Sequence, residues 1–220
     1  MPKPTIKQVY FDLGHVVIDV DKEAVARALA PHSELGFSGL MKIFGKGYTN
    51  FEREFWDIVC EFDRGNLHPH EFHNKIKRVL KLKIGFKAFE GAWQSMLVLD
   101  KRFIKLVCEL KRQGIGTGII SDLCVIHYNR FREMVPYRGL FDNWFFSYQH
   151  GLLKRDRDGM IFEAAIRACR IQDPSQIVFV DDLEINIKYA SGYGLSTFQY
   201  RSDFIELLDF LASFEFYMRL

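Results

Sequence analysis

Ile177-Val178-Phe179-Val180-Asp181-Asp182 joins four consecutive apolar residues to two adjacent carboxylates. An apolar run of this length is typical of a strand that is buried on both faces, as strands in parallel sheets are. Two neighbouring carboxylates at the exit of such a strand repel each other unless they share a cation. The alternative is a pair that only caps the following helix. The stretch therefore favours a buried parallel strand that ends at a metal site.

The rest of the chain repeats the pattern of a strand followed by a helix. Strand-like segments occupy residues 8–11, 115–120, 144–147 and 196–199. Segments with helical spacing occupy residues 100–113, 123–134, 160–169, 185–191 and 204–210. Strands that alternate with helices predict an α/β fold, a three-layer Rossmann-like core whose parallel sheet is covered on both faces.

Residues 22–96 interrupt this alternation. They contain only helix-like segments, at 22–30, 39–44, 51–62 and 70–80, and turn signals at 45–47 and 63–66 separate them. A helical block between the first strand and the next helix–strand unit indicates an insertion. We therefore expect a catalytic core of residues 1–21 and 97–220 and a small helical cap of residues 22–96.

Composition limits the classes of protein that remain. The chain has 220 residues, 48% of them hydrophobic and 26% charged, which is ordinary for a globular domain. A net charge of +2 argues against a nucleic-acid partner, and the apolar runs are too short to cross a membrane. No signal peptide is evident, so we expect a cytoplasmic protein with reduced, mostly buried cysteines. The sequence leaves the oligomeric state open, with the monomer favoured.

Ligands of an open parallel sheet bind beyond the carboxyl ends of its strands. In this chain the expected strands are followed by polar residues: Asp12, the pair Ser121-Asp122, Lys154, and the pair Asp181-Asp182. One Asp after a strand is unremarkable, because Asp is common in turns. Four strand ends that supply Asp, Ser, Lys and Asp-Asp form a much stronger pattern.

These residue types suit the chemistry of a phosphate ester. Carboxylates from different strands can share a Mg²⁺ ion and leave coordination sites for water and a phosphate. A hydroxyl and a backbone N–H at the start of a helix after Ser121 can bind phosphate oxygens. An ammonium at Lys154 would balance the charge. A carboxylate beside the phosphorus can attack it and form an acyl phosphate, which water then hydrolyses.

Four motifs in this order resemble those of the haloacid dehalogenase-like (HAD) hydrolase superfamily. They are Tyr10-Phe11-Asp12-Leu13-Gly14-His15-Val16-Val17-Ile18-Asp19, Ile119-Ile120-Ser121-Asp122, Gly151-Leu152-Leu153-Lys154, and residues 178–186 with their Asp-Asp-x-x-x-Asn pattern. The cap resembles the small helical type of the bacterial α-glucose-1-phosphatase-like subgroup, through residues 62–67, 71–72 and 92–94. The resemblance covers most of the chain.

For the metal, the resemblance implies four ligands or supporting groups. Asp12 would be both the nucleophile and a Mg²⁺ ligand, and Gly14 would offer its backbone carbonyl. Asp182 would be the direct carboxylate ligand of the fourth motif, and Asp181 would support it.

For the substrate, the resemblance implies that Ser121 and the backbone amide of Asp122 hold the phosphate while Lys154 balances its charge. His15 follows the first motif closely, and three roles stay open for it: local packing, a phosphate contact, or acid–base catalysis.

The chain departs from the family pattern at three positions. Most phosphatases of the superfamily have an Asp two residues after the nucleophile, which protonates the leaving oxygen, whereas this chain has Gly14. Loss of a general acid costs about 10²–10⁴-fold in rate and should affect alkyl esters most. Asp122 stands where the subgroup usually has Asn, and Arg155 stands where the family usually has Pro. His15 or Asp19 is a candidate substitute for the missing acid.

The resemblance implies a Mg²⁺-dependent phosphomonoesterase that acts on a small phosphorylated metabolite through an aspartyl-phosphate at Asp12. Only the cap resemblance favours a sugar phosphate as the substrate class. One alternative is a catalytically weak phosphate-binding or regulatory protein, and another is a haloacid dehalogenase, against which the Asp181-Asp182 pair argues. The cap aromatics either line the substrate pocket or form the cap's own core: Phe44, Tyr48, Phe51 and Trp56.

Overall fold

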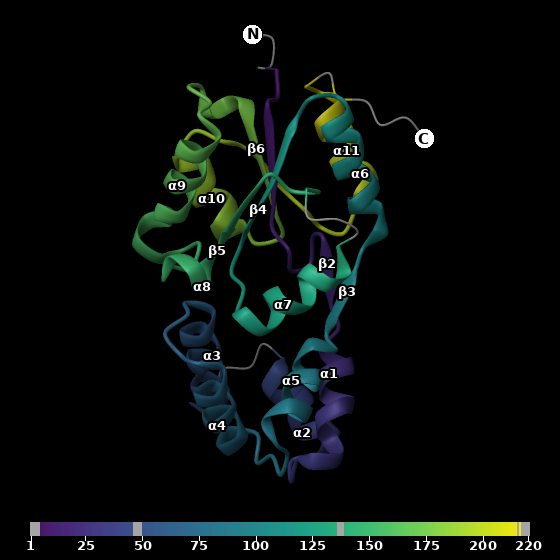
Figure 1. Cartoon of the computed structure of the whole chain (residues 1–220), viewed down its shortest axis with the longest axis vertical. Coiled ribbons are helices and arrows are strands. Elements are labelled where there is room, and N and C mark those ends of the chain that lie inside the picture. Colours follow the sequence, from purple (N-terminus) through teal and green to yellow (C-terminus); the bar gives the residue numbers. More distant parts are fainter. Residues whose placement is uncertain (1–4, 46–49, 136–138, 215, 217–220) are drawn as a thin grey trace.

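Five parallel strands form the central sheet, in the order β5-β4-β1-β6-β7 (Figure 1). The computed structural model of the chain describes residues 5–45, 50–135, 139–214 and 216. The strands are β1 (Gln8–Phe11), β4 (Gly116–Ser121), β5 (Asn143–Phe146), β6 (Ile177–Asp181) and β7 (Ser196–Gln199). This is the parallel α/β sheet that the alternating sequence pattern predicts.

Strand β1 lies at the centre of the sheet and pairs in parallel with β4 and β6, so the register of these pairs decides where the three strands end. Phe11 pairs with Ile119 of β4 on one side and with Val180 of β6 on the other. The backbone N–H of Asp12 then donates a hydrogen bond of 2.8 Å to the carbonyl of Val180. The residues that follow β1, β4 and β6 consequently meet at one edge of the sheet.

Helices cover both faces of the sheet, because successive residues of each strand point to opposite sides. Tyr10 packs on one face and donates a hydrogen bond of 3.1 Å to the carbonyl of Ala165. Phe11 packs on the other face, where its ring centroid lies 5.8 Å from that of Phe103. The covering helices are α6 (Lys101–Arg112), α7 (Val125–Met134), α9 (Met160–Cys169), α10 (Glu184–Gly192) and α11 (Phe204–Ala212).

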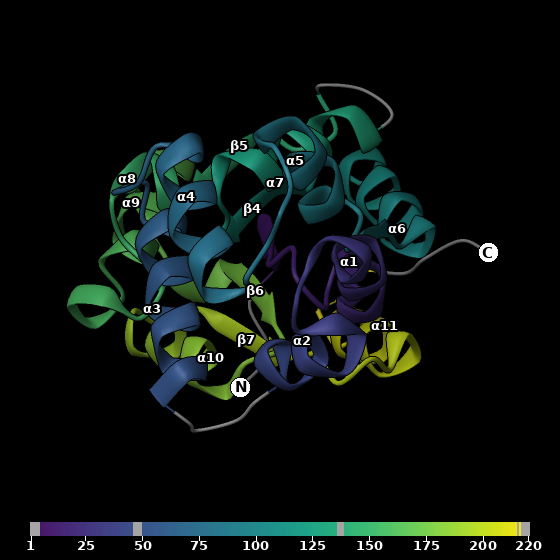
Figure 2. The same ribbon diagram turned by 90° about the horizontal axis from the view of Figure 1, so that it is seen from below.

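A group of helices lies beyond the carboxyl ends of the strands (Figures 1 and 2). They are α1 (Lys22–Leu29), α2 (Gly36–Phe44), α3 (Asn50–Asp63), α4 (Pro69–Val79) and α5 (Phe86–Gln94). Two short antiparallel strands, β2 (Ile18–Val20) and β3 (Leu97–Leu99), join this group to the sheet domain. The division at residues 22–96 stays a prediction, and this arrangement agrees with it. We call these helices the cap below.

Three elements of the cap region escape the sequence pattern. Strands β2 and β3 have three residues each, too few for a period to show, and α5 lies in a stretch that the helical spacing does not mark.

The expectation about cysteines is wrong in one respect, since only Cys124 is buried and Cys108 is exposed. Among the described helices, none has the length and apolar character that a membrane crossing needs. The short helical turns are α8 (Ser147–His150) and three 3-10 turns at Ala30–His32, Asp156–Gly159 and Pro174–Gln176.

Gly118 on β4 leaves room for the Tyr10 ring and for the backbone of β5. A Cβ atom added there would lie 2.3 Å from the Tyr10 ring and 2.9 Å from the carbonyl oxygen of Asn143. Gly118→Ala should therefore lower the free energy of unfolding by about 1–3 kcal/mol, measured by urea denaturation. Gly91→Ala is the control, because a Cβ there meets open space on α5 and should be neutral or slightly stabilising. An unchanged midpoint for Gly118→Ala would contradict this account.

Candidate active site

The ammonium of Lys154 is buried between two carboxylates. Its Nζ lies 2.9 Å from Oδ1 of Asp12 and 2.6 Å from Oδ2 of Asp181, and only 2% of the lysine side chain is exposed. Asp12 follows β1, Asp181 ends β6, and Lys154 lies in the loop between α8 and α9. The structure thus brings together three residues that the strand-end pattern singles out.

This pairing fixes the charge of the lysine. Burial alone would lower the pKa of the Lys154 ammonium, but the carboxylates of Asp12, Asp181 and Asp122 raise it above its ordinary value. Burial raises the pKa of Asp12 to about 7, against the opposing effect of Lys154. A further positive charge beside Asp12 would lower that pKa and keep the carboxylate ionised at neutral pH.

The two carboxylates after β6 have different surroundings. Asp181 is fully buried and accepts hydrogen bonds from Lys154, from the side-chain amide of Asn186 at 3.0 and 3.1 Å, and from the backbone N–H of Leu183 at 2.8 Å. Asp182 is half-buried, and within the described part of the chain no other residue donates to its carboxylate. Asp181 is therefore held by protein groups, whereas Asp182 has oxygens available for a ligand.

Carboxylate oxygens of Asp12, Asp181 and Asp182 lie within 4.8 Å of one another. Hard divalent cations such as Mg²⁺ bind oxygen donors and keep several waters, so they need few protein ligands. The donor set at this edge of the sheet fits such an ion. Burial and the neighbouring Asp181 also raise the pKa of Asp182, as expected for carboxylates gathered without a counter-ion.

Ser121 and Asp122 follow the course of β4 into the same site. Ser121 is buried, and its hydroxyl hydrogen-bonds Asp12. Asp122 does not cap helix α7, since Cys124 occupies the N-cap position and makes no side-chain capping bond. Instead, Oδ1 of Asp122 accepts a hydrogen bond of 2.8 Å from the backbone N–H of Lys154. The carboxylate therefore holds the lysine loop, and its predicted part in phosphate binding stays a prediction.

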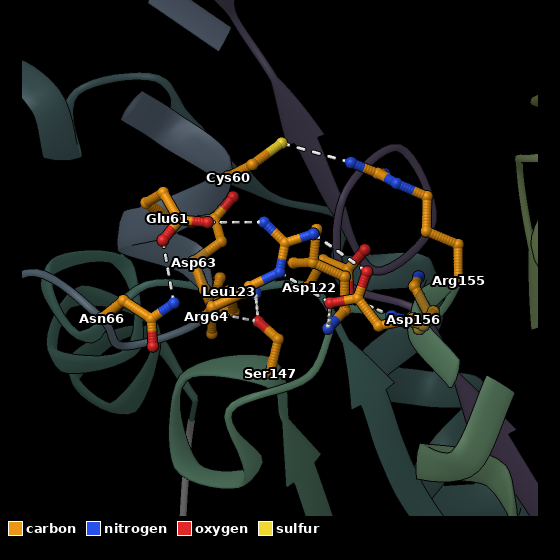
Figure 3. A network of polar contacts seen from close by, with 12 residues as sticks. Cys60, Glu61, Asp63, Arg64, Asn66, Asp122, Leu123, Ser147, Arg155 and Asp156 are labelled. Atoms are coloured by element: carbon orange, nitrogen blue, oxygen red, sulfur yellow. Dashed lines mark hydrogen bonds and ion pairs between the residues drawn. The ribbon is translucent and has the colours of Figure 1, made fainter. Parts of the chain in front are cut away.

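The other side of the lysine loop is held by the cap (Figure 3). Arg64, just past the end of α3, donates two hydrogen bonds of 2.7 and 2.9 Å to the carboxylate of Asp156. That carboxylate also accepts from the backbone N–H of Leu153 at 2.9 Å. Arg155 donates a hydrogen bond of 3.2 Å to the sulfur of Cys60, which lies on α3. Arg155 therefore belongs to the contact between cap and core rather than to the charge balance at Asp12.

A second contact fastens the same turn of the cap. The hydroxyl of Ser147 donates a hydrogen bond of 2.5 Å to the carbonyl of Asp63 and accepts one of 2.9 Å from the backbone N–H of Leu123 (Figure 3). Gly65 has a φ of +78°, and a Cβ there would lie 2.4 Å from the carbonyl oxygen of Tyr148. Glycine at this position is needed both for the turn and for the close approach.

His15 and Gly14 are the other two candidates of the first motif. His15 is exposed on 46% of its side chain, has a φ of +57°, and its Nδ1 lies 3.9 Å from Oδ1 of the exposed Asp19. Gly14 borders a cavity between the core and the cap. The structure gives Gly14 no side chain to protonate a leaving group, and the roles predicted for His15 and for the Gly14 carbonyl stay predictions.

Aromatic side chains of the cap surround that cavity. Phe44 and Trp56 line it, as one of the two alternatives for the cap aromatics predicts. Phe44 also packs against Phe55, with ring centroids 5.5 Å apart, so the cavity wall and the cap core are continuous. Tyr48 lies outside the described residues, as does the side chain of Phe51.

Arg64, Ser147 and Asp156 are the site residues that sequence reasoning missed. The bonded partners Arg64 and Asp156 are 92 positions apart, and the carbonyl of Asp63 is 84 positions from Ser147. Spacing along the chain carries no sign of such contacts. The Asp63-Arg64-Gly65-Asn66 turn carries a signal as a boundary between helices and as part of the cap resemblance, but neither points to a contact with Asp156 or Ser147.

Removing the buried ammonium should cost stability. In Lys154→Met, Asp12 and Asp181 lose the cation that compensates their burial, so the free energy of unfolding should fall by about 3–5 kcal/mol in metal-free urea denaturation. Lys83→Met is the control. That lysine pairs with Glu34 at 2.9 Å while 77% of its side chain is exposed, and the loss should be within about 1 kcal/mol. Equal effects of the two substitutions would contradict the pairing described here.

Asp63 should make the stability depend on pH. Burial, together with the carboxylate of Asp122, raises the pKa of Asp63 to about 8. Between about pH 4 and pH 8 the folded chain then binds a proton that the unfolded chain lacks, so stability falls as the pH rises. Asp63→Asn should flatten this dependence and be more stable than the wild type at pH 8. The exposed Asp57→Asn on the same helix is the control, and a curve identical to that of Asp63→Asn would oppose the assignment.

Comparison with known proteins finds no protein-family model that matches the chain. Curated proteins that are similar in sequence include two phosphatases. A D-ribitol-5-phosphate phosphatase of Bacteroides thetaiotaomicron is 24% identical over 202 residues, which are 88% of this chain and 91% of that protein. A sesquiterpene phosphatase of Aspergillus oryzae is 26% identical over 152 residues, 67% of this chain and 72% of that protein.

Solved structures share the fold. A HAD family enzyme from Bacteroides thetaiotaomicron superposes with a TM-score of 0.77 at 26% identity, over 92% of this chain and 98% of that one. The same enzyme in complex with magnesium and inorganic phosphate gives a TM-score of 0.74. An L-2-haloacid dehalogenase from Xanthobacter autotrophicus gives 0.63 at 14% identity, over 93% and 81% of the two chains, which shows the fold alone. With the strand-end residues described above, these similarities identify the chain as a HAD-like hydrolase.

Proposed function

We propose that the protein is a Mg²⁺-dependent phosphomonoesterase that forms an aspartyl-phosphate on Asp12. The observation that carries the proposal is the position of the Asp12 carboxylate, at the end of β1, 2.9 Å from the Lys154 ammonium and beside the carboxylates of Asp181 and Asp182. A nucleophilic carboxylate, a fixed cation and a site for a divalent ion are the groups that this reaction needs.

The relatives support the same reaction class. Both curated relatives are phosphatases, and the solved relative binds magnesium and inorganic phosphate. The substrate we propose is accordingly a small phosphorylated metabolite. Resemblance of the cap alone favours a sugar phosphate, whereas the two curated relatives act on different alcohols, a polyol and a terpenoid.

The residues would hold Mg²⁺ through the carboxylates of Asp12 and Asp182 and the carbonyl of Gly14, with Asp181 supporting. When bound, the ion supplies positive charge that neutralises the phosphate and keeps Asp12 ionised. Asp181 is suited to the supporting role because its oxygens are engaged by Lys154, Asn186 and Leu183.

Asp12 then attacks the phosphorus in line with the leaving alcohol. A bond forms between a carboxylate oxygen and phosphorus, and the bond from phosphorus to the ester oxygen breaks as that oxygen takes a proton from solvent water. A water oxygen next attacks the same phosphorus, which releases inorganic phosphate and restores the carboxylate. Lys154 stays protonated throughout and offsets the negative charge that Asp12 and the phosphate bring together.

A catalytically weak phosphate-binding protein is the second candidate. Gly14 offers no acid to the leaving group, which is the observation that favours this alternative. A haloacid dehalogenase is opposed by the Asp181-Asp182 pair, because attack on carbon needs no cation. Dependence on Asp12 and on Mg²⁺ separates these functions.

Asp12→Asn should abolish Mg²⁺-dependent phosphate release. The amide is a much weaker nucleophile, so activity on p-nitrophenyl phosphate and on a panel of metabolite phosphates should fall to background. The exposed Asp209→Asn on α11 is the control and should keep most of the activity. Release of phosphate by the wild type that survives both chelation of Mg²⁺ and the loss of Asp12 would overturn the proposal.

Gly14→Asp should increase the rate on alkyl phosphates. A Cβ at this position makes only an ordinary contact of 3.7 Å with Val20, so the fold accepts a side chain. An added acid should accelerate alkyl esters by about 10²-fold, the lower end of general acid catalysis, and p-nitrophenyl phosphate much less. Gly14→Asn has the same shape without the acid and is the control. Equal acceleration by both variants would contradict the assigned gap.

A further inference from the structure

A cavity of about 180 Å³ lies between the cap and the core. Its walls combine residues of the core, such as Leu13 and Leu123, with residues of the cap, such as Phe44, Phe55, Trp56 and Val59. Most of these side chains are aliphatic or aromatic. The cavity is therefore an apolar chamber that the cap closes over the sheet edge.

The chamber borders the proposed phosphate site. Leu13 and Gly14 directly follow the nucleophile Asp12, while Asp122 and Leu123 directly follow Ser121. A phosphate held beside Asp12 consequently has this chamber as the adjoining space for its organic group. The side chains that line it therefore select which esters bind, according to the alcohol that each ester carries.

Few polar groups of the chamber are available to a ligand. The Nε2 atom of His127 lies 3.2 Å from the carbonyl of Trp93, and burial lowers the pKa of this histidine to about 4, so the ring is neutral and engaged. Asp122 accepts from the backbone of Lys154, and the Lys22 ammonium lies 5.8 Å from the centroid of the Trp56 ring. Among the described residues of the wall, the unpaired polar groups are the carboxyl group of Asp63 and the buried indole N–H of Trp93.

These walls favour one class of alcohol over another. A polyol would bring several hydroxyls into the chamber, and each one left unpaired weakens binding by about fivefold to a hundredfold. An apolar group gains about fourfold in affinity for each methylene removed from water. A cavity of about 150 Å³ lined by aliphatic and aromatic side chains binds benzene, so this chamber holds about six to ten carbon atoms.

We infer that the substrate is the phosphate monoester of an apolar alcohol of about six to ten carbons. The inference rests on the proposed function, because it takes Asp12 as the site of phosphoryl transfer. It differs from the expectation of a sugar phosphate, which derives from resemblance of the cap and not from its lining. Aromatic and aliphatic contacts from Phe44, Trp56 and Val59 would bind the organic group.

The test is a series of phosphate esters with one leaving-group chemistry. The n-alkyl phosphates from methyl to dodecyl differ in apolar surface but hardly in the pKa of the alcohol. We expect kcat/KM to rise by about fourfold per methylene, with a plateau or a decline beyond about ten carbons. Pentyl phosphate and ribitol 5-phosphate are a matched pair, with five carbons each and four hydroxyls in the second. A flat series, or a faster reaction of ribitol 5-phosphate, would overturn the inference.

Two variants of α3 locate the effect. Val59→Phe places a ring in the chamber wall and should flatten the chain-length series, so that the longer esters no longer react faster than methyl phosphate. Ile58→Phe adds the same ring at the neighbouring half-buried position, outside the chamber wall, and should keep the chain-length series. Identical profiles for the two variants would count against the chamber as the binding site.

A binding measurement separates this inference from the proposed function. Methyl-, pentyl- and octylphosphonate are not hydrolysed, and their affinity for Asp12→Asn in the presence of Mg²⁺ can be measured by calorimetry. Affinity that rises with chain length supports the apolar site even if no ester is hydrolysed by the wild type, an outcome in which only the proposed reaction fails. Phosphate release from esters without any dependence on chain length leaves the reaction standing and overturns the apolar substrate class.

Discussion

A buried ammonium between two buried carboxylates is the interaction on which the site depends. Lys154 compensates Asp12 and Asp181, two residues that burial alone would drive toward the neutral form. Each of these groups is costly to bury alone, and the ion pairs with Lys154 hold the Asp12 carboxylate in position. The sheet supplies the geometry, because β1 and β6 are neighbours and end at the same level.

The loop that carries Lys154 links this charge cluster to the cap. Asp122 binds its backbone from the core side, and Asp156 binds it while receiving both hydrogen bonds of Arg64 from the cap side. A change in the position of the cap would therefore change the position of the loop that carries Lys154. The apolar chamber above Gly14 shares the same boundary, so the shape of the chamber and the alignment of the charges depend on one set of contacts between cap and core.

The sequence anticipated the sheet, the helical layer and the residues that follow the strands, because each leaves a local pattern. Apolar runs predict β1 and β6, and the strand-end rule brings Asp12, Lys154 and Asp181 together. The contact that Asp122 makes leaves no local pattern, because its partner is the distant backbone of Lys154. The contact of Arg64 with Asp156 and the apolar lining of the chamber depend on how the cap lies on the core. Such packing between segments far apart in the chain has no period in the sequence.

Strands β2 and β3 give the cap a property that concerns evolution and engineering. The backbone N–H of Asp21 donates to the carbonyl of Met96 at 2.8 Å, and that of Asp100 donates to Val17 at 3.0 Å. The chain thus leaves the sheet domain and returns to it at adjacent points. A helical module of different size or shape can therefore replace the cap between those points without changing the path of any strand of the sheet. The cap can then diversify by exchange of the module, while the charge cluster at the edge of the sheet is inherited unchanged.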